Sequence, residues 1–360
     1  ISVEDTGGKL TEKEGVEFHE GIMIPGFINC HCHLELSDLR GKILPGQGLA
    51  GFIHDIRTIR GRDITESSQS ASKADKMLFD EGVMLCADIC NTSVTFEIKK
   101  KSQVEYINLL EVFGIDPEKA EQRFSELTRM SEVAESSGLN YSVVPHSTYS
   151  LSLPLLRMVR SATSSNRVTS IHFMESAAEE EFLRNHSGEI KESYLRSGLG
   201  TITETVSDHA SAVLQEITPS GNLILVHNTF AVRETVRKVS ERNNLFWCLC
   251  PRSNLYIENQ LPQVEMLIGE GCEIVMGTDS LASNSSLSIL EELKTIQGRF
   301  PSIPLETLIR WATLNGARAL CRESIFGSIE MGKKPGLLLI RDADLINIRL
   351  TGESRIKRLI

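Results

Sequence analysis

The chain has 360 residues, a formal net charge of −10 at neutral pH and 41% hydrophobic residues. This composition excludes a disordered chain and allows a sizeable apolar core. The acidic balance argues against nucleic acid or an anionic membrane as the main partner, because both require a basic surface. We therefore expect a globular protein, and the acidity says little about a site for a small-molecule substrate, which a few local groups determine.

Eight apolar runs recur along the chain, and polar stretches with helical periodicity separate most of them. In chain order the runs are Ile24–Leu34, Gly82–Cys90, Val104–Phe113, Tyr141–Ser150, Arg167–Glu175, Asn222–Phe230, Leu245–Asn254 and Cys272–Leu281. Short runs rich in Val, Ile, Leu and Cys are typical of strands buried on both faces. The stretches Glu118–Gly138 and Ala231–Asn243 are typical of amphipathic helices. Strands that alternate with helices predict a parallel sheet, and eight of them predict a closed (β/α)8 barrel.

The two ends of the chain lie outside this pattern. Before Pro25 the chain has glycine, charge and short apolar stretches, and after Gly327 the segments Ser328–Ile340 and Asp344–Leu350 resemble strands joined by turns. We expect both ends to pair into one small β domain. The predicted division is 1–24 for its N-terminal part, 25–324 for the barrel and 325–360 for its C-terminal part.

The eight cysteines predict free thiols rather than disulfides. Cys248 and Cys250 alternate within an apolar run, as Cys30 and Cys32 do on either side of His31. A chain of this length needs no disulfides for stability. No apolar run is long enough to span a bilayer. We therefore expect a reducing compartment, the cytoplasm.

The first run ends in a pair of histidines with the spacing of metal ligands. Residues two apart in a strand face the same side, so His31 and His33 should face one side, and Cys30 and Cys32 the other. Two imidazoles on one face form half of a zinc or iron site. Such a pair also arises by chance in a chain with nine histidines, so it requires support from other residues.

That support comes from the ends of the other runs. Five of the nine histidines lie at or near the ends of predicted strands, namely His31, His33, His146, His172 and His227. In a barrel these ends meet at one mouth. The eighth run ends at Asp279, and a buried carboxylate is costly unless it is paired or bound to a metal. Singly, His172 or His227 would be interpreted as a core histidine, but together the residues predict a catalytic metal with a position open to water.

Seven segments match one known pattern in the same order. They are Pro25–His33, His172–Glu175, His227, Cys250–Asn254, Gly277–Ser280, Asn315–Leu320 and Gly327–Lys333. The chain resembles the amidohydrolase superfamily, in particular its branch of cytosine, guanine, adenosylhomocysteine and aminodeoxyfutalosine deaminases and the related chlorohydrolases. The resemblance covers nearly the whole chain. It implies a (β/α)8 barrel with a small β-sandwich formed by both chain ends.

The resemblance also implies a ligand set. His31, His33, His172 and Asp279 would bind one divalent metal ion, zinc or alternatively iron. Two-metal members of the superfamily carry a modified lysine on the fourth strand, and the run Tyr141–Ser150 contains no lysine. This difference favours a single metal, which would lower the pKa of a bound water molecule.

Further residues take roles by the same resemblance. Asp279 would accept the proton of the water molecule, and His227 would orient it. Glu175 would protonate a ring nitrogen of the substrate and pass protons to the leaving ammonia. His146 would either face the substrate or support a neighbouring ligand, and the sequence leaves both interpretations open.

The resulting hypothesis is an enzyme that removes ammonia hydrolytically from an aminated N-heterocycle, in particular an adenine-type nucleoside derivative. A second hypothesis keeps the same single-metal site but changes the bond that is cleaved. The enzyme would then be a chlorohydrolase or another amidohydrolase. A third is a non-catalytic scaffold, which the complete set of ligand residues argues against. The sequence does not specify the oligomeric state, and a homodimer is one option because dimers are the commonest assembly.

Overall fold

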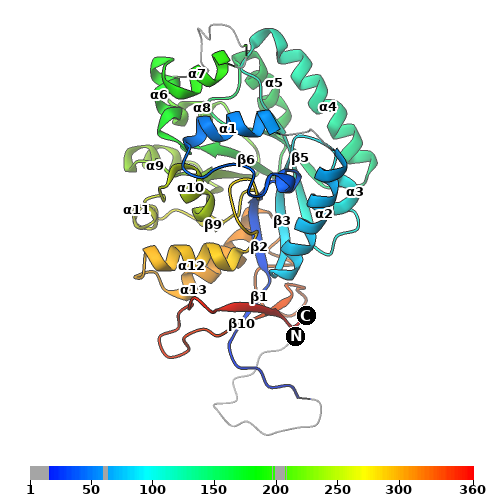
Figure 1. The fold of residues 1–360 in the computed structure, drawn as a ribbon, viewed down its shortest axis with the longest axis vertical. Helices are drawn as coiled ribbons and strands as arrows, with labels where there is room; N and C mark the ends of the chain where they lie inside the picture. The colour runs from blue at the N-terminus through cyan, green and yellow to red at the C-terminus, as the bar shows by residue number, and fades with distance from the viewer. Residues whose placement is uncertain (1–15, 60–63, 197, 199–206, 208) are drawn as a thin grey trace.

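The computed structural model describes residues 16–59, 64–196, 198, 207 and 209–360. Eight parallel strands form its centre (Figure 1): β2 (Phe27–Cys32), β3 (Val83–Cys90), β4 (Glu105–Val112), β5 (Tyr141–Pro145), β6 (Val168–Phe173), β7 (Asn222–His227), β8 (Leu245–Leu249) and β9 (Ile274–Met276). They pair in the orders β2-β3-β4-β5 and β6-β7-β8-β9. Bridges from Ser147 to His172 and from Cys32 to Asp279 join the two halves into a ring. The predicted (β/α)8 barrel is therefore confirmed.

Helices surround the strands and fill the connections between them. They are α1 (Gly48–Ile59), α2 (Ile64–Asp80), α3 (Phe96–Lys99), α4 (Ala120–Ser136), α5 (Leu153–Thr163), α6 (Ala177–Asn185), α7 (Gly188–Arg196), α8 (Ala210–Gln215), α9 (Arg233–Ser240), α10 (Pro251–Glu258), α11 (Val264–Gly269), α12 (Ile289–Arg299), α13 (Leu305–Arg310) and α14 (Gly316–Ala319). Short helical turns are η1 (Leu34–Leu39), η2 (Pro117–Lys119) and η3 (Trp311–Asn315). The two predicted helices are present as α4 and α9, each a few residues shorter than its polar stretch.

Most strands are shorter than the apolar runs that predicted them. The run Leu245–Asn254, for example, ends as a strand at Leu249, and α10 begins at Pro251. Proline suits the first turn of a helix, because its missing N–H would have no intrahelical partner there. The residues beyond each strand stay buried because they line the mouth of the barrel. Their apolar character therefore reflects burial rather than strand structure.

The core has two layers, one inside the barrel and one between the strands and the helices. Ile28, Leu109 and Val226 pack inside the barrel, whereas Trp247 and Trp311 are buried in the outer layer. The prediction that Cys30 and Cys32 share a face is wrong: Cys30 packs inside and Cys32 outside. A shift of register between Asn29 and Cys32 interrupts the alternation of β2.

Both ends of the chain contribute to a small separate sheet, which lies at the lower end of the view in Figure 1. In it β1 (Ile22–Pro25) pairs antiparallel with β10 (Leu337–Arg341), and β10 pairs with β11 (Arg355–Arg358). The two chain ends thus pair in one sheet, which in the described residues is a single three-stranded layer. The strand predicted at Asp344–Leu350 is wrong. Asp344 there accepts hydrogen bonds from the backbone N–H groups of Ile346 and Asn347, which forms a turn.

Two further expectations concern the whole chain. All eight cysteines are free thiols, and six of them are buried. Among the described residues, no helix has the length and apolar character that crossing a bilayer requires.

Candidate active site

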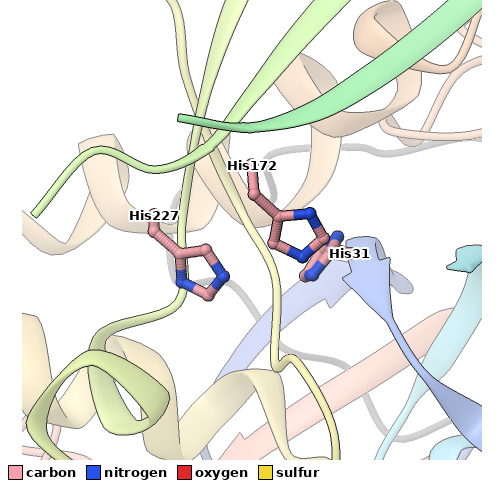
Figure 2. A group of neighbouring side chains, drawn as sticks. All are labelled: His31, His172 and His227. Carbon is pink, nitrogen blue, oxygen red and sulfur yellow. The ribbon is translucent and has the colours of Figure 1, made fainter. Parts of the chain in front are cut away.

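Imidazoles from three strands converge at the mouth of the barrel. His31 lies in β2, His172 in β6 and His227 at the end of β7, and Figure 2 shows these three side chains together. The ring centres of His31 and His172 are 4.9 Å apart, and those of His172 and His227 are 5.3 Å apart. His33 follows β2, and its Nε2 atom lies 3.1 Å from Nε2 of His31. The sequence prediction that these histidines meet is therefore correct.

Asp279 faces the His31–His33 pair. Its backbone N–H donates to the carbonyl oxygen of His31 at 3.0 Å, which holds the residue beside β2. Its Oδ2 atom accepts hydrogen bonds of 2.6 Å from the hydroxyls of Ser253 and Ser283. Its Oδ1 atom lies 3.8 Å from Nε2 of His31 and 3.6 Å from Nε2 of His33. The two serines thus direct one carboxylate oxygen toward the imidazoles.

The backbone around Asp279 requires an unusual conformation. Asp279 has a φ of 55° and His227 a φ of 75°, in the left-handed region that residues other than glycine seldom adopt. Gly277 allows β9 to approach β2, since a Cβ atom at this position would lie only 2.8 Å from Cβ of His31. Strained backbone of this kind often occurs at functional sites, where the surrounding structure supports it.

Hydrogen bonds determine which nitrogen of two histidines carries a proton. Nδ1 of His172 lies 2.7 Å from the carbonyl oxygen of His146, and a carbonyl oxygen can only accept. Nδ1 of His227 likewise lies 2.8 Å from Oδ1 of Asn254. Each Nδ1 therefore carries the proton when the ring is neutral, and each Nε2 keeps a free electron pair. Such bonds are typical of histidines that bind a metal through the other nitrogen.

The site has the donor set of a metal centre. The ligand atoms of His31, His33 and Asp279 lie within 4.8 Å of one another, and so do those of His31, His172 and His227. Burial lowers the pKa of His31 and of His172 well below the usual value, so both rings are neutral and able to act as ligands. Nδ1 of His31 and Nδ1 of His33 have no hydrogen-bond partner within the described part of the chain. Neutral imidazoles and one carboxylate suit zinc or iron.

Burial and the polar neighbours of Asp279 act in opposite directions on the pKa of its carboxyl group. Burial alone would raise the pKa of its carboxyl group. The nearby imidazoles of His33, His227 and His31 and the hydroxyl of Ser253 outweigh burial and lower the pKa to about 2. Asp279 is therefore a carboxylate at neutral pH, as a metal ligand or a proton acceptor must be.

Glu175 lies beside this cluster, and its pKa is shifted in the opposite direction to that of Asp279. Its Oε1 atom is 3.5 Å from Nε2 of His227. Its backbone N–H donates to Oε2 of Glu179 at 3.1 Å, and the other oxygen of Glu179 accepts from the hydroxyl of Thr148. Burial, with a smaller contribution from the charge of Asp279, raises the pKa of Glu175 well above its usual value. A carboxyl group in this environment stays protonated near neutral pH and can donate a proton.

His146 combines the two roles that the sequence left open. Its carbonyl oxygen orients His172, while its ring stacks on the ring of His172 with the centres 4.6 Å apart. The ring also lines the cavity in front of the cluster. The backbone thus positions a predicted ligand, and the side chain faces the space where a substrate would lie.

The cavity has a volume of about 680 Å³, which is typical of sites for small molecules. His33, His172, His227, Glu175 and Asp279 form its polar floor. Helix α1 contributes apolar residues to the walls, among them Leu49, Phe52 and Ile56. The first turn of α1 is held by Glu258, whose Oε1 atom accepts a hydrogen bond of 2.8 Å from the N–H of Leu49. Helix α1 therefore belongs to the site rather than to the outer ring.

A buried ion pair behind β2 was not predicted from the sequence. Nζ of Lys99 lies 2.5 Å from Oδ2 of Asp88, and both side chains are almost completely buried. Oδ1 of Asp88 accepts a hydrogen bond of 2.7 Å from the N–H of Leu34, the residue after His33. Lys99 also contacts Oδ1 of Asn108 at 2.9 Å. The pair thus fixes the chain where it leaves the strand that carries both histidines.

We expect Lys99→Met to lower the free energy of unfolding by about 3–5 kcal/mol, because it leaves the buried charge of Asp88 without compensation. Urea denaturation followed by circular dichroism measures the change. Lys76→Met is the matched control, since Lys76 forms an exposed pair with Asp80 that contributes little. Equal stability of the two variants would show that Asp88 needs no counter-ion.

A barrel of eight parallel strands with a histidine–aspartate cluster at the carboxyl ends of its strands defines the class of metal-dependent TIM-barrel hydrolases. Residues 22–351 match the Amidohydrolase family. The match spans most of the chain, and the protein belongs to this family. The family and the hydrolase class predicted from the sequence are therefore confirmed.

Individual relatives are similar over most of their length. An adenosine deaminase from Helicobacter pylori is 28% identical over 339 residues, which cover 89% of this chain and 79% of that protein. An aminodeoxyfutalosine deaminase from Nitratiruptor is 28% identical over 354 residues, with 94% and 85% covered. A crystal structure of Helicobacter pylori aminofutalosine deaminase in complex with methylthio-coformycin has a TM-score of 0.75 and 24% identity, covering 88% of this chain and 78% of that one. This last similarity supports the barrel fold.

Proposed function

We propose that the protein is a hydrolytic deaminase of an aminated N-heterocycle, in particular of an adenine-type nucleoside derivative. Water adds at the carbon that carries the amino group, and ammonia leaves. The observation that carries this proposal is the pairing of buried Glu175 with His227, whose Oε1 and Nε2 atoms lie 3.5 Å apart beside the metal-type cluster. A proton donor and a proton acceptor then face one cavity, as the reaction needs.

His31, His33, His172 and Asp279 would hold a divalent cation, as their converging ligand atoms allow. When bound, the cation supplies Lewis-acid polarisation, which makes a water molecule acidic near neutral pH. The fixed protons on Nδ1 of His172 and His227 leave an Nε2 electron pair on each ring. We assign His172 to the cation and His227 to the substrate side, because His227 lies next to Glu175.

The proton transfers follow from the protonation states of the side chains. Glu175 is protonated and donates to a ring nitrogen, which makes the neighbouring carbon electrophilic. Nε2 of His227 accepts a hydrogen bond from the attacking water and orients it. Oδ1 of Asp279 takes the proton that this water loses, since the carboxylate is ionised. Glu175, now ionised, takes the proton of the newly added hydroxyl group and passes it to the amino group, which departs as ammonia as the carbonyl forms. The proton held by Asp279 then restores Glu175.

The names of two similar proteins support the adenine-type ring. The adenosine deaminase from Helicobacter pylori and the aminodeoxyfutalosine deaminase from Nitratiruptor are each 28% identical to this chain. Zinc as the metal, a homodimer and a cytoplasmic location stay predictions that neither the geometry of the site nor these similarities test.

We expect the purified protein to contain about one zinc or iron ion per chain and to release ammonia from adenosine or a derivative of it. Elemental analysis and a coupled ammonia assay on one sample measure both. Guanine and cytosine are the control substrates. Metal without ammonia from any of these compounds would contradict the deaminase and favour another leaving group, such as chloride. No metal after reconstitution would favour a non-catalytic scaffold.

A further inference from the structure

A third carboxyl group, that of Glu111, faces the cavity and takes no part in the mechanism above. Glu111 lies near the end of β4, and its side chain is only 1% exposed. It lines the cavity together with His146 and His172. Its position is on the opposite side of His172 from His227 along the strand order of the barrel.

One oxygen of Glu111 is anchored by a chain of hydrogen bonds. Its Oε2 atom accepts from Nδ2 of Asn91 at 2.9 Å. The backbone N–H of Asn91 donates to Oε1 of Glu35 at 3.1 Å. Oε2 of Glu35 accepts from both the backbone and the hydroxyl of Thr92, at 3.0 and 2.8 Å. Loops after β2 and β3 thus hold the Glu111 carboxylate in a fixed orientation.

The other oxygen, Oε1, is buried and has no hydrogen-bond partner among the described residues. Nδ1 of His172 lies 3.6 Å from this oxygen. The proton of that nitrogen points to the carbonyl oxygen of His146, which is much closer at 2.7 Å. A buried acceptor without a donor is costly and therefore rare. The arrangement is that of a prepared acceptor waiting for a donor from a ligand.

We infer that Oε1 of Glu111 binds a hydroxyl group on the sugar of a nucleoside substrate. The inference rests on the proposed function. An adenine nucleoside has two kinds of hydrogen-bond donor, the exocyclic amino group and the sugar hydroxyls. The amino group must lie at the reaction centre between Asp279 and Glu175. The sugar hydroxyls are then the donors that remain for Glu111.

The test removes the carboxyl group of Glu111 and one sugar hydroxyl of the substrate, first separately and then together. The protein variant is Glu111→Ala, and the substrates are adenosine and its 2′-, 3′- and 5′-deoxy analogues. With the wild type, kcat/KM for one of the analogues should fall about 10- to 100-fold below that for adenosine, as for a lost hydrogen bond to a charged group. In the variant the same analogue and adenosine should react equally well. If Glu111→Ala does not fold, Glu111→Gln is used instead. It should reduce the difference in kcat/KM between adenosine and the deoxy analogue.

Two controls exclude a purely structural effect. Glu105→Gln changes the same residue type at the opposite end of β4, where Glu105 pairs with Arg322, and should leave the discrimination unchanged. Metal content should be the same in all variants. If Glu111→Ala instead loses metal, or slows every substrate by one factor, Glu111 acts through His172 and the inference is wrong. Wild-type protein that treats all four nucleosides alike would also overturn it.

A binding measurement separates this inference from the proposed function. Inosine and its deoxy analogues cannot be deaminated, so calorimetric titration reports recognition without turnover. Weaker binding of one analogue to the wild type, with the difference abolished in Glu111→Ala, supports the inference even if adenosine is not a substrate. Deamination of adenosine without any such difference keeps the proposed function and overturns the role of Glu111.

Discussion

Asp279→Ala is expected to abolish turnover and to weaken metal binding by more than about 100-fold, since loss of an outer partner alone costs about 10- to 100-fold. Oδ1 of this residue faces Nε2 of both His31 and His33. It provides the one negative charge among the four proposed ligands. Its removal leaves three neutral imidazoles and also removes the proposed proton acceptor. Metal content after dialysis and titration against a chelator measure the affinity.

Two control variants provide reference values for the loss of metal affinity and activity in Asp279→Ala. Ser283→Ala removes one of the two hydroxyls that hold Oδ2 of Asp279, so the metal should bind about 10- to 100-fold more weakly and activity should persist at saturating metal. Asp344→Ala changes an exposed turn of the small sheet and should alter neither quantity. An Asp279→Ala protein with full metal content would remove this carboxylate from the ligand set.

The histidine cluster was predictable because strand periodicity and barrel topology both constrain it. Residues at the carboxyl ends of parallel strands meet at one mouth, so His31, His172 and His227 could be placed together from their positions alone. The faces of Cys30 and Cys32 could not be predicted, because the irregularity in β2 depends on pairing with β3. Local alternation cannot reveal a shift that a neighbouring strand imposes.

The acidic residues show a second limit of prediction from the sequence. A carboxylate at the end of an apolar run indicated Asp279, and the same argument applies to Glu111 in Val104–Phe113 and to Asp88 in Gly82–Cys90. The signal was therefore present for both. Their partners were not predictable, since the positions of Lys99, the last residue of α3, and of Asn91, in the loop after β3, depend on tertiary packing. Glu35 gave no signal in the sequence, but it is buried and anchors that network.

The segment Cys250–Asn254 matches the family pattern, but the sequence alone offers no physical explanation for it. The structure supplies one. Ser253 bonds Oδ2 of Asp279, and Asn254 fixes the proton of His227 on Nδ1. Both contacts join residues more than 20 positions apart. They depend on α10 starting directly after β8 at Pro251, which presents these two side chains to the mouth.

Glu175→Gln is expected to lower kcat by about 10²- to 10⁴-fold while metal content stays unchanged. Glutamine keeps the shape and hydrogen-bonding capacity of the side chain but cannot donate an acidic proton. The ligand atoms of His31, His33 and Asp279 are not disturbed, because Glu175 contacts His227 instead. Steady-state kinetics and elemental analysis on the same preparation measure the two effects. Full activity of the variant would exclude Glu175 as the proton donor.

The same substitution should stabilise the metal-free protein, and the gain should depend on pH in a defined direction. Burial raises the pKa of Glu175 in the folded state above its unfolded value, so the folded state holds this proton more tightly. The wild type therefore has its full stability below the unfolded pKa of about 4.3 and loses part of it as the pH rises toward the folded pKa. Glutamine does not titrate. The gain in the free energy of unfolding of Glu175→Gln over the wild type should therefore be small at pH 4 and increase toward pH 8. Urea denaturation at both pH values tests this. A variant that is less stable than the wild type at pH 8 would show that Glu175 is held as a carboxylate, and therefore cannot serve as the acid.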